Sequence, residues 1–304
     1  PFYVVNAKQH FYNLVVKDFI NDYTHGITPN PCLNCNRHIR FGLLLDQSMA
    51  YGADFLATGH YARLRLEQNN KFQLLRALDS KKDQSYVLHI LNQEQLSKVL
   101  FPIGEYTKEE VRQIAIKFNL PTSTRQDSQD LCFLAGGDYR EFLERNSPET
   151  LKPGNIATSS GKILGEHSGL ALFTIGQRKG LGVTGDQPFY VINKDISTNT
   201  LVIGTREEMG NSSLIAKNVN WISSEIPDKP FRALVKIRYK AADAWGTIYP
   251  RSQHTIQIQF DEPLRDITPG QAAVIYQDQV CIGGGIIEYS ANSVKLRQDQ
   301  EILQ

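Results

Sequence analysis

The feature of this sequence that most constrains its fold is a change in hydrophobic pattern near Leu151. Before this point, apolar residues recur at helical spacing, and the helical stretches alternate with short strand-like runs, which predicts an α/β domain. After it, short apolar runs are separated by Gly, Pro, Asn and Ser, which indicates a β-rich half. We therefore expect an α/β domain over residues 1–150 and two β-rich domains over 151–221 and 222–304, with linker-like sequence near 223–230.

Several helices of the first half are predicted by their start and stop signals. The apolar pattern over residues 7–23 predicts a helix that Gly26 ends, and residues 37–50 predict a second helix after the loop TPNPCLNCN. Thr107 and Glu110 have the spacing of a capping box and begin a third helix. The apolar face of that helix comprises Val111, Ile114, Ala115 and Phe118. A strand at 54–58, a hairpin turn at residues 69–70 and a helix over 138–146 complete this half.

Composition sets broad limits on the class of protein. The chain has 304 residues, 41% of them hydrophobic, so it is long enough for two or three domains with proper cores. No stretch approaches the roughly 18 to 20 apolar residues that a membrane span needs, and no signal peptide is recognisable, so we expect a cytoplasmic protein with no membrane partner. The formal net charge of +1 excludes a strongly basic protein but not a local basic face.

Cys32 and Cys35 form a CxxC motif directly after a Pro-rich turn. We expect Cys35 at the start of the following helix, where the helix dipole lowers the pKa of a thiol, with Arg37 and His38 adding to the effect. This predicts a nucleophilic or redox cysteine. CxxC is also the spacing of half a structural zinc site, although the chain has no second CxxC.

Cys132 lies in the polar segment RQDSQDLCFL, about a hundred residues further on. It is a candidate for thiol exchange with a cysteine of the CxxC motif, or for an iron–sulfur cluster held together with Cys32 and Cys35. The alternative is a small buried side chain, the ordinary fate of a free cysteine. Cys281, between Val280 and Ile282, fits that alternative, and we assign it to the core.

Four further segments contain residues suited to binding. Gly59 and His60 follow the carboxyl end of an apolar strand, where open α/β sheets place ligands. The segment KKDQSY at 81–86 is rich in charge, which is most often typical of a solvated turn. The segment TIGQRKGLG at 174–182 combines Arg178 and Lys179 with glycines, which suits phosphate contact but also any exposed hairpin. Lys236, Arg238 and Lys240 alternate along an expected strand and form a possible basic stripe, although a solvated strand face is the commoner explanation.

Taken together, the chain closely resembles the tRNA-specific 2-thiouridylase family over essentially its whole length. The resemblance is carried by seven segments in order: TPNPCLNCNRHIRFG, DFLATGHYAR, KKDQSYVL, DSQDLCFL, GLALFTIGQRKGLG, KIRY, and TPGQAAVIY followed by GGGII. It implies an α/β domain of the ATP-pyrophosphatase (adenine nucleotide alpha-hydrolase-like) type, incomplete here, then a β-rich central domain and a C-terminal β-barrel.

The resemblance also implies a reaction and roles for individual residues. ATP, with Mg²⁺, adenylates the 2-oxygen of the wobble uridine of tRNA, and sulfur then displaces AMP. Cys132 matches the cysteine that carries persulfide sulfur from a donor protein, a persulfide relay or a cysteine desulfurase. Cys35 matches the catalytic nucleophile that forms a disulfide with it, and Gly59 matches an ATP contact. Matching tRNA contacts are Asn30, Pro31, Cys32, His60, Lys82, Asp83, Gln84, Arg238, Tyr239 and Gln271.

Two departures from the family pattern leave alternatives open. Many relatives carry Asp at the position of Cys32, so Cys32, Cys35 and Cys132 are also candidate ligands of a 4Fe-4S cluster. The family's SGGVDS-type phosphate loop has no counterpart, and Pro1 corresponds to a point downstream of it, so we expect an N-terminally truncated chain. The alternatives are a catalytically silent tRNA-binding remnant and, on the CxxC motif alone, a zinc- or cluster-binding redox protein.

Overall fold

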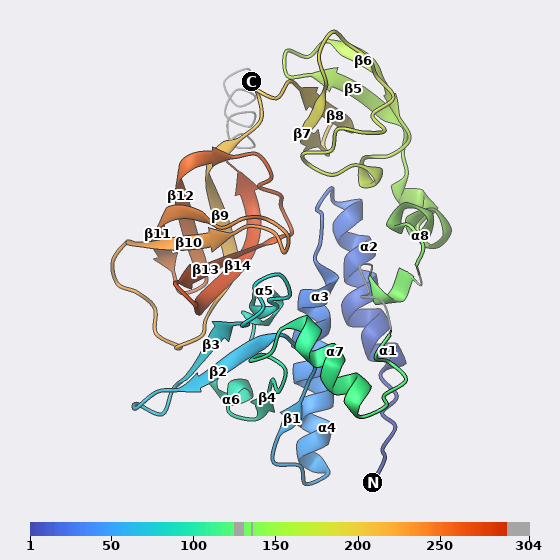
Figure 1. Ribbon diagram of the computed structural model, residues 1–304. Helices are drawn as coiled ribbons and strands as arrows, with labels where there is room; N and C mark the ends of the chain where they lie inside the picture. The colour runs from blue at the N-terminus through green and yellow to red at the C-terminus, as the bar shows by residue number, and fades with distance from the viewer. Residues whose placement is uncertain (125–130, 135, 291–304) are drawn as a thin grey trace.

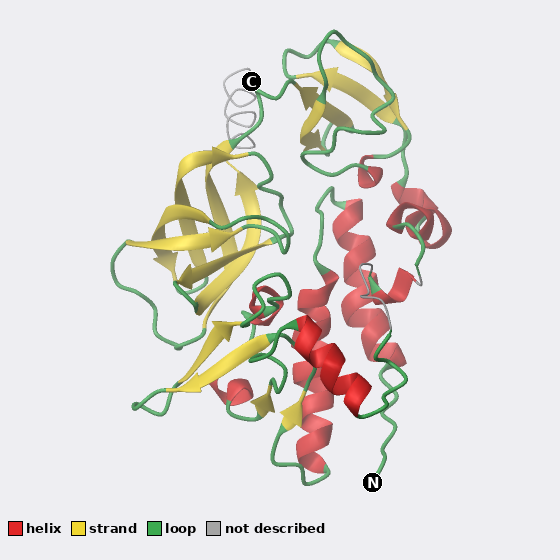
Figure 2. Ribbon diagram, viewed as in Figure 1, coloured by secondary structure: helices red, strands yellow, loops and turns green. Residues whose placement is uncertain are grey.

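The computed structural model describes residues 1–124, 131–134 and 136–290. A helical and mixed part formed by the N-terminal half lies below two β-rich parts, one formed by the middle of the chain and one by its C-terminal third (Figures 1 and 2). The described residues include no helix long and apolar enough to cross a membrane. The α/β domain followed by two β-rich domains confirms the predicted fold class.

Two long helices lie side by side in the first part (Figure 1). The first combines α1 (Lys8–Phe11), a π-helical segment (Tyr12–Val16) and α2 (Lys17–Thr24), as predicted. The second combines α3 (Pro31–Asn34), a π-helical segment (Cys35–Leu44) and α4 (Leu45–Ala50). It begins earlier than we predicted, because the Asn30 side chain accepts a hydrogen bond from the Cys32 amide and Pro31 occupies the first helical position.

The rest of the first part consists of short elements around a common core. Strands β1 (Leu56–Ala57) and β4 (Val99–Leu100) pair in parallel, and β2 (Ala62–Leu66) and β3 (Phe72–Arg76) form the predicted hairpin, with Asn70 at a φ of 60° in its turn. Helices α5 (Ser85–Leu88) and α6 (Gln93–Leu96) cover the hairpin. Helix α7 (Lys108–Lys117) begins at Thr107 with the predicted capping box.

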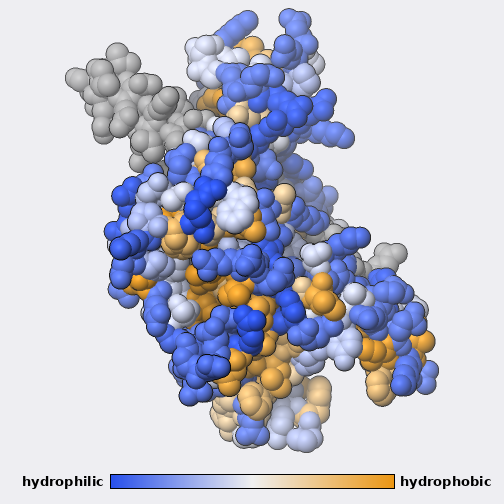
Figure 3. All heavy atoms as spheres, turned by 60° about the vertical axis from the view of Figure 1, so that its left-hand side comes forward, coloured by the Kyte–Doolittle hydropathy of each residue, from blue (hydrophilic) through white to orange (hydrophobic). Residues whose placement is uncertain are grey.

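The apolar face of α7 is not covered by the described residues. No residue of the helix is buried, and Ile114, Ile116 and Phe118 are 39%, 51% and 67% exposed. Further apolar residues gather at the lower end of the molecule, where β1 and β4 lie (Figures 1 and 3). Phe55 and Leu100 are among the exposed side chains of that region. Parallel strands are usually buried on both faces, so the exposure of this pair is unusual.

The central part is a small four-stranded sheet that follows α8 (Tyr139–Asn146), a helix capped by Asp138 as predicted. Its strands run in the order β6 (Ile163–His167), β5 (Gly154–Thr158), β8 (Thr200–Gly204), β7 (Tyr190–Asp195). Ile156, Val191, Leu201 and Ile203 are fully or almost fully buried in its core.

The C-terminal part is a closed six-stranded antiparallel barrel, as predicted. Its strands are β9 (Asn211–Trp221), β10 (Phe231–Lys236), β11 (Ala244–Ser252), β12 (Thr255–Leu264), β13 (Ala272–Gln277) and β14 (Val280–Ser290), and the pairing of β13 with β14 closes it. Strand β9 pairs with β12 and β14, so the barrel includes residues that we had placed before the boundary at 222. The linker-like sequence at 223–230 connects two strands within the barrel.

The first part and the barrel are joined through backbone pairing and buried hydrogen bonds. Strand β3 pairs with β14 and extends the barrel sheet. The hydroxyl of Tyr86, fully buried in α5, donates to the carbonyl oxygen of Ala272 at 3.0 Å and accepts from its amide at 3.1 Å. Asn220 in β9 donates to the carbonyl oxygens of His89 and Leu91. These contacts make the first part and the barrel one packed unit.

Replacing Tyr86 by Phe tests this junction. The substitution leaves the buried carbonyl and amide of Ala272 without their partner, which costs about 1–3 kcal/mol of stability. We expect a lower midpoint in chemical denaturation of the Tyr86→Phe variant. Tyr106→Phe, at a side chain that is 42% exposed, is the matched control. Equal midpoints for the two variants would contradict a structural role of the Tyr86 hydroxyl.

Candidate functional site

Three thiols lie together in one site, two from the CxxC motif and one from a segment about a hundred residues further along the chain. Cys32 and Cys35 lie in the first turns of the second long helix, and Cys132 begins a short 3₁₀ turn, Cys132–Leu134. A negative charge on Cys35 or Cys132 raises the pKa of Cys32, and a charge on Cys132 raises the pKa of Cys35. Such coupling requires short separations, so the structure brings together the cysteines that the sequence analysis singled out.

The residues on either side of Cys132 anchor it to the first long helix. Leu131 and Phe133 pack on an apolar cluster built around Phe19, Tyr23 and Leu143. The ring of Phe133 lies edge-on to those of Phe19 and Phe142, with centroids 5.1 and 5.5 Å apart. These contacts hold the Cys132 turn beside the helices. The neighbouring residues 125–130 and 135, which include part of the segment RQDSQDLCFL, lie outside the described residues.

The environment of the thiols corrects one expectation. We predicted that the helix dipole lowers the pKa of Cys35, whereas the pKa of Cys35 is raised, with burial as the largest cause. Cys32 is open to solvent on one side, but the protein around it raises the pKa of its thiol to about 11. Cys35 also lies beyond the first turn, where the dipole effect has fallen off, because the helix begins at Pro31.

Arg40 is the cation that acts on Cys35, and the sequence analysis missed it. It hydrogen-bonds the Cys35 side chain, and both this bond and its charge lower the pKa of the thiol against the effect of burial. The sequence predicted that Arg37 and His38 add to the lowering of this pKa, but neither is among the groups that shift it. The π-helical segment Cys35–Leu44 connects residues five apart and so brings Arg40 above Cys35.

The three thiols do not form a metal-binding group in this structure. Within the described residues, which include all four cysteines, no set of three His, Cys, Asp or Glu side chains is placed to hold a metal ion. The arrangement therefore does not fit the ligand set of a 4Fe-4S cluster. All four cysteines are free thiols, so the expected Cys35–Cys132 disulfide is not formed. Cys281 is 1% exposed, and burial raises the pKa of its thiol well above the usual range, as fits a core residue.

Gly59 and His60 follow strand β1, at the position predicted for a ligand. Space next to Gly59 is open, since a Cβ atom added there meets nothing within 4 Å. His60 is buried between Phe41 and Phe101, and its Nδ1 lies 2.8 Å from the Thr58 hydroxyl. Burial and the charge of Arg40 lower the pKa of His60 to about 4, so the ring is neutral at pH 7. Gly59 is accessible to a ligand, whereas the His60 side chain is largely enclosed.

The segment Lys82 to Gln84 is mostly engaged within the fold. The buried carboxylate of Asp83 accepts hydrogen bonds from the amides of Ala77 and Ser85 at 3.0 and 3.1 Å. Gln84 accepts from the Tyr61 amide at 3.0 Å. Lys82 is half-buried. Asp83 and Gln84 thus fix the loop that presents Lys82.

Asn30, Tyr239 and Gln271 border the thiols on the barrel side. Asn30 caps the helix that carries Cys32 and also hydrogen-bonds Tyr86. The ring of Tyr239 is 6.1 Å from that of Tyr86, and a charge on Cys32 contributes to raising the pKa of Tyr239. Gln271 donates to the carbonyl oxygens of Thr28 and Pro29 at 2.9 and 3.2 Å, which ties the barrel to the loop before Pro31.

The basic stripe that we considered along Lys236, Arg238 and Lys240 is not formed. Strand β10 ends at Lys236, so the alternation of a strand does not continue to Arg238. Arg238 turns instead toward the central domain, where it donates to the carbonyl oxygen of Ile175 at 3.0 Å, and it also donates to the hydroxyl of Thr268 in the barrel.

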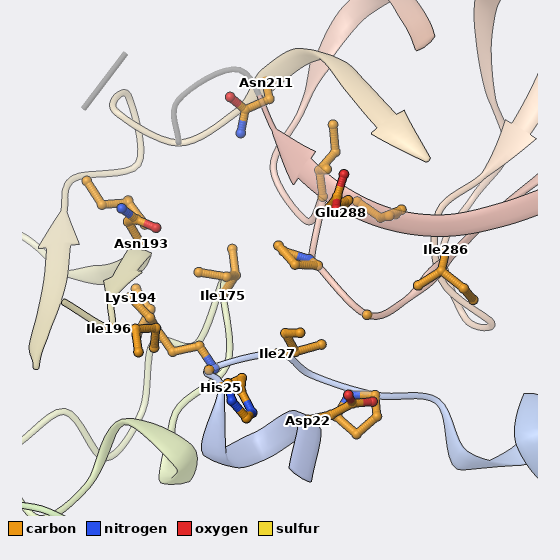
Figure 4. A pocket seen from close by; sticks show the side chains of 18 of the residues that line it. Asp22, His25, Ile27, Ile175, Asn193, Lys194, Ile196, Asn211, Ile286 and Glu288 are labelled. Atoms are coloured by element: carbon orange, nitrogen blue, oxygen red, sulfur yellow. The ribbon is translucent and has the colours of Figure 1, made fainter. Parts of the chain in front are cut away.

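A cavity of about 700 Å³ lies where all three domains meet (Figure 4). Ile27, Ile175 and Ile286, one from each domain, contribute apolar walls. Burial, with the nearby Asp18, raises the pKa of the Asp22 carboxyl in this cavity to about 6. Lys194 reaches toward His25 in Figure 4 and donates to the Phe173 carbonyl oxygen at 3.0 Å, and burial lowers its pKa to about 8.

Models of three protein domains match the chain in the order of its three parts. The tRNA methyl transferase HUP domain matches residues 1–136, the tRNA methyl transferase PRC-barrel domain residues 140–205, and the aminomethyltransferase beta-barrel domain residues 211–287. The last match begins at Asn211 in β9, in agreement with the strand pairing of the barrel. These matches define the class: a HUP-domain protein with a PRC-barrel domain and a C-terminal β-barrel.

Curated relatives narrow the class to a family. The chain is 42% identical over 302 residues to the tRNA-specific 2-thiouridylase MnmA of Roseiflexus castenholzii, covering 94% of this chain and 81% of that protein. It is 45% identical over 289 residues to MnmA 1 of Caldanaerobacter subterraneus, covering 95% and 79%, and 44% identical over 288 residues to MnmA of Natranaerobius thermophilus, covering 94% and 78%. The chain belongs to the tRNA-specific 2-thiouridylase MnmA family.

The raised pKa of Asp22 predicts a pH-dependent effect of Asp22→Asn. The carboxyl titrates near pH 6 in the folded protein and near 3.9 when unfolded, so its charge destabilises the fold increasingly from about pH 4 to pH 6 and by a constant amount above. Because Asp22 is only partly buried, we expect Asn to stabilise the protein by about 1 kcal/mol at pH 7.5 and by nothing near pH 4. Denaturation at both pH values, with the exposed Asp46→Asn as control, checks this. An equal gain in stability at both pH values would contradict the prediction.

The contact between Arg40 and Cys35 predicts a change in thiol reactivity. Without the guanidinium, less Cys35 is present as thiolate, and alkylation of Cys35 in the Arg40→Gln variant should slow several-fold at pH 8, since one pKa unit is about a tenfold change. Mass spectrometry of the Cys35 peptide over time gives the rate. His38→Gln should leave the rate close to that of the native protein. A larger effect of His38→Gln would restore our original assignment.

Proposed function

We propose that this chain is a tRNA 2-thiouridylase, which replaces the 2-oxygen of the wobble uridine by sulfur. The observation that carries the proposal is the convergence of Cys32, Cys35 and Cys132 in one site of a chain that belongs to this family. A thiol pair that is close in space but distant in sequence suits a relay of sulfur from one cysteine to the other.

The proposed reaction begins with activation of the uridine. The uridine 2-oxygen attacks the α-phosphorus of ATP, and pyrophosphate leaves, so that AMP becomes the leaving group at the uridine C2. In support, Gly59 leaves open space at the carboxyl end of β1, the edge at which α/β sheets bind nucleotides. The printed sequence contains no SGGVDS-type segment, so Gly59 is the ATP contact that this proposal places on the chain.

Sulfur transfer then uses the two cysteines in sequence. The terminal sulfur of a Cys132 persulfide, loaded by a sulfur-donor protein, attacks C2, and AMP leaves. The Cys35 thiolate attacks Sγ of Cys132, and the electron pair of the broken S–S bond forms the C2=S group. The two cysteines end as a disulfide, which a thiol reductant must reduce before the next turnover. Arg40, by stabilising the Cys35 thiolate, supports this second attack.

Substitution of the thiols tests the proposal in the full natural protein. Cys35→Ser and Cys132→Ser should each abolish thiolation of unmodified tRNA while leaving its tRNA affinity within about twofold, because neither thiol contributes a charge to RNA binding. Thiolated uridine is measured by mass spectrometry of digested tRNA. Cys281→Ala is the control, because Cys281 lies in the core at 1% exposure, and it should retain activity.

The outcomes separate the proposal from its alternatives. Activity that survives Cys132→Ser would refute the persulfide role of Cys132. Iron assayed on anaerobically purified native protein, at one cluster per chain and lost in Cys32→Ser, would favour a cluster mechanism. Tight tRNA binding by the native protein without any product, in the presence of ATP and sulfide, would favour a catalytically silent tRNA-binding protein.

A further inference from the structure

A second cavity, of about 750 Å³, lies between the central domain and the barrel. Three cationic side chains from separate segments line it: Arg140 from α8, Lys179 from the loop 174–180, and Arg238 from the barrel. Asp266 is the carboxylate among its lining residues. The positive charge of the lining therefore exceeds the negative charge by two.

The two arginines are fixed in place by hydrogen bonds. Arg140 donates to the Leu172 carbonyl oxygen at 3.0 Å and to the Asp138 carboxylate at 3.3 Å. Arg238 donates through Nη2 to Ile175 and Thr268, while its buried Nε has no acceptor among the residues that the structure describes. A buried guanidinium N–H without an acceptor is costly, which indicates a site completed by a ligand.

The loop that carries Lys179 is also held in one conformation. Gln177 accepts from the Thr174 amide at 3.1 Å and donates to the Lys179 carbonyl oxygen at 2.9 Å. Gly176 and Gly180 take φ angles of 86° and 75°, which side chains rarely adopt. The exposed ammonium group of Lys179 has no ion-pair partner within the described part of the chain. The loop thus presents a free cation at the cavity.

The cavity lies beside the thiol site. Tyr239, the residue after Arg238, is close enough to Cys32 for a thiolate charge there to raise its pKa, and Arg238 itself acts electrostatically on Tyr86. The ring of Tyr239 lies 6.1 Å from that of Tyr86, and Arg238 lines the cavity, so an RNA strand with a base at the thiols would have its neighbouring phosphates on the side of Arg238. Arginine forks and a lysine ammonium are the groups that proteins use to bind such phosphates.

We propose that this cavity binds a backbone phosphate of the tRNA, held by Arg140 and Lys179 on the central-domain side and by Arg238 on the barrel side. The inference rests on the proposed function, since it takes tRNA as the substrate. It assigns RNA-contacting roles to Arg140, Lys179 and the loop 174–180, and it explains why Arg238 faces the central domain instead of forming a basic stripe.

The test is the salt dependence of tRNA binding by the full natural protein. Each phosphate contact contributes about 0.7–0.9 to the slope of log K against log salt, so Lys179→Ala should weaken binding and reduce the slope by about that amount. The Lys179→Arg variant should retain both the tRNA affinity and the slope of the native protein. The control is Lys162→Ala, an exposed lysine in the turn between β5 and β6 of the same domain, which should behave as the native protein.

Each outcome decides a separate point. A Lys179→Ala variant that matches Lys162→Ala in affinity and slope would overturn the inference, even if the native protein binds and thiolates tRNA. If Lys179→Ala leaves tRNA binding unchanged but abolishes binding of inorganic phosphate, the cavity binds a free phosphate. That result would overturn the RNA contact. If the native protein fails to bind tRNA, the proposed function and the inference both fail. Thermal unfolding of each variant excludes misfolding as the cause.

Discussion

The arrangement of the site depends on the buried Tyr86 hydroxyl, which both donates to and accepts from the backbone of Ala272 in the barrel. The same side chain hydrogen-bonds Asn30, the residue that caps the helix carrying Cys32. Strand pairing between β3 and β14 extends this junction over a second set of backbone groups. The barrel therefore does more than follow the first domain in sequence, because Gln271 in the barrel also holds the loop that precedes the thiol-bearing helix.

At Cys32 and Cys35, burial raises the pKa of the thiol and the positive charge of Arg40 lowers it. The balance between these two effects determines which thiol ionises. Burial is the largest cause that raises the pKa of Cys32 and Cys35, a charge on Cys35 or Cys132 raises the pKa of Cys32 further, and a charge on Cys132 raises that of Cys35. Formation of one thiolate therefore suppresses formation of the next. Cys32, whose pKa is about 11, stays uncharged at neutral pH, and a neutral thiol does not repel a polyanionic RNA. Arg40 favours Cys35 as the thiol that ionises.

Local signals in the sequence predicted the elements whose structure is determined locally. The capping box of Thr107 and Glu110 and the turn at Asn70 form as expected, since neighbouring residues satisfy them. The start of the second long helix was missed, although Asn30 followed by Pro31 is a usable start signal. Arg40 was not predictable from α-helical spacing, because its approach to Cys35 follows from a π-helical segment. Neither the exposed face of α7 nor the turn of Arg238 toward Ile175 is encoded by local pattern, since both depend on which surfaces meet.

The two interdomain cavities show why binding sites of this kind resist prediction from sequence. Arg140, Lys179 and Arg238 are separated by tens of residues and lie in a helix, a loop and the turn after strand β10, so no motif contains them. Only the docking of the central domain against the barrel places them around one space. A phosphate bound there would contact both domains at once, and its binding free energy would then favour the arrangement in which they meet. Among the described residues, no strand of the central domain pairs with a strand of the other two, so side-chain contacts such as that of Arg238 with Ile175 hold it beside the barrel.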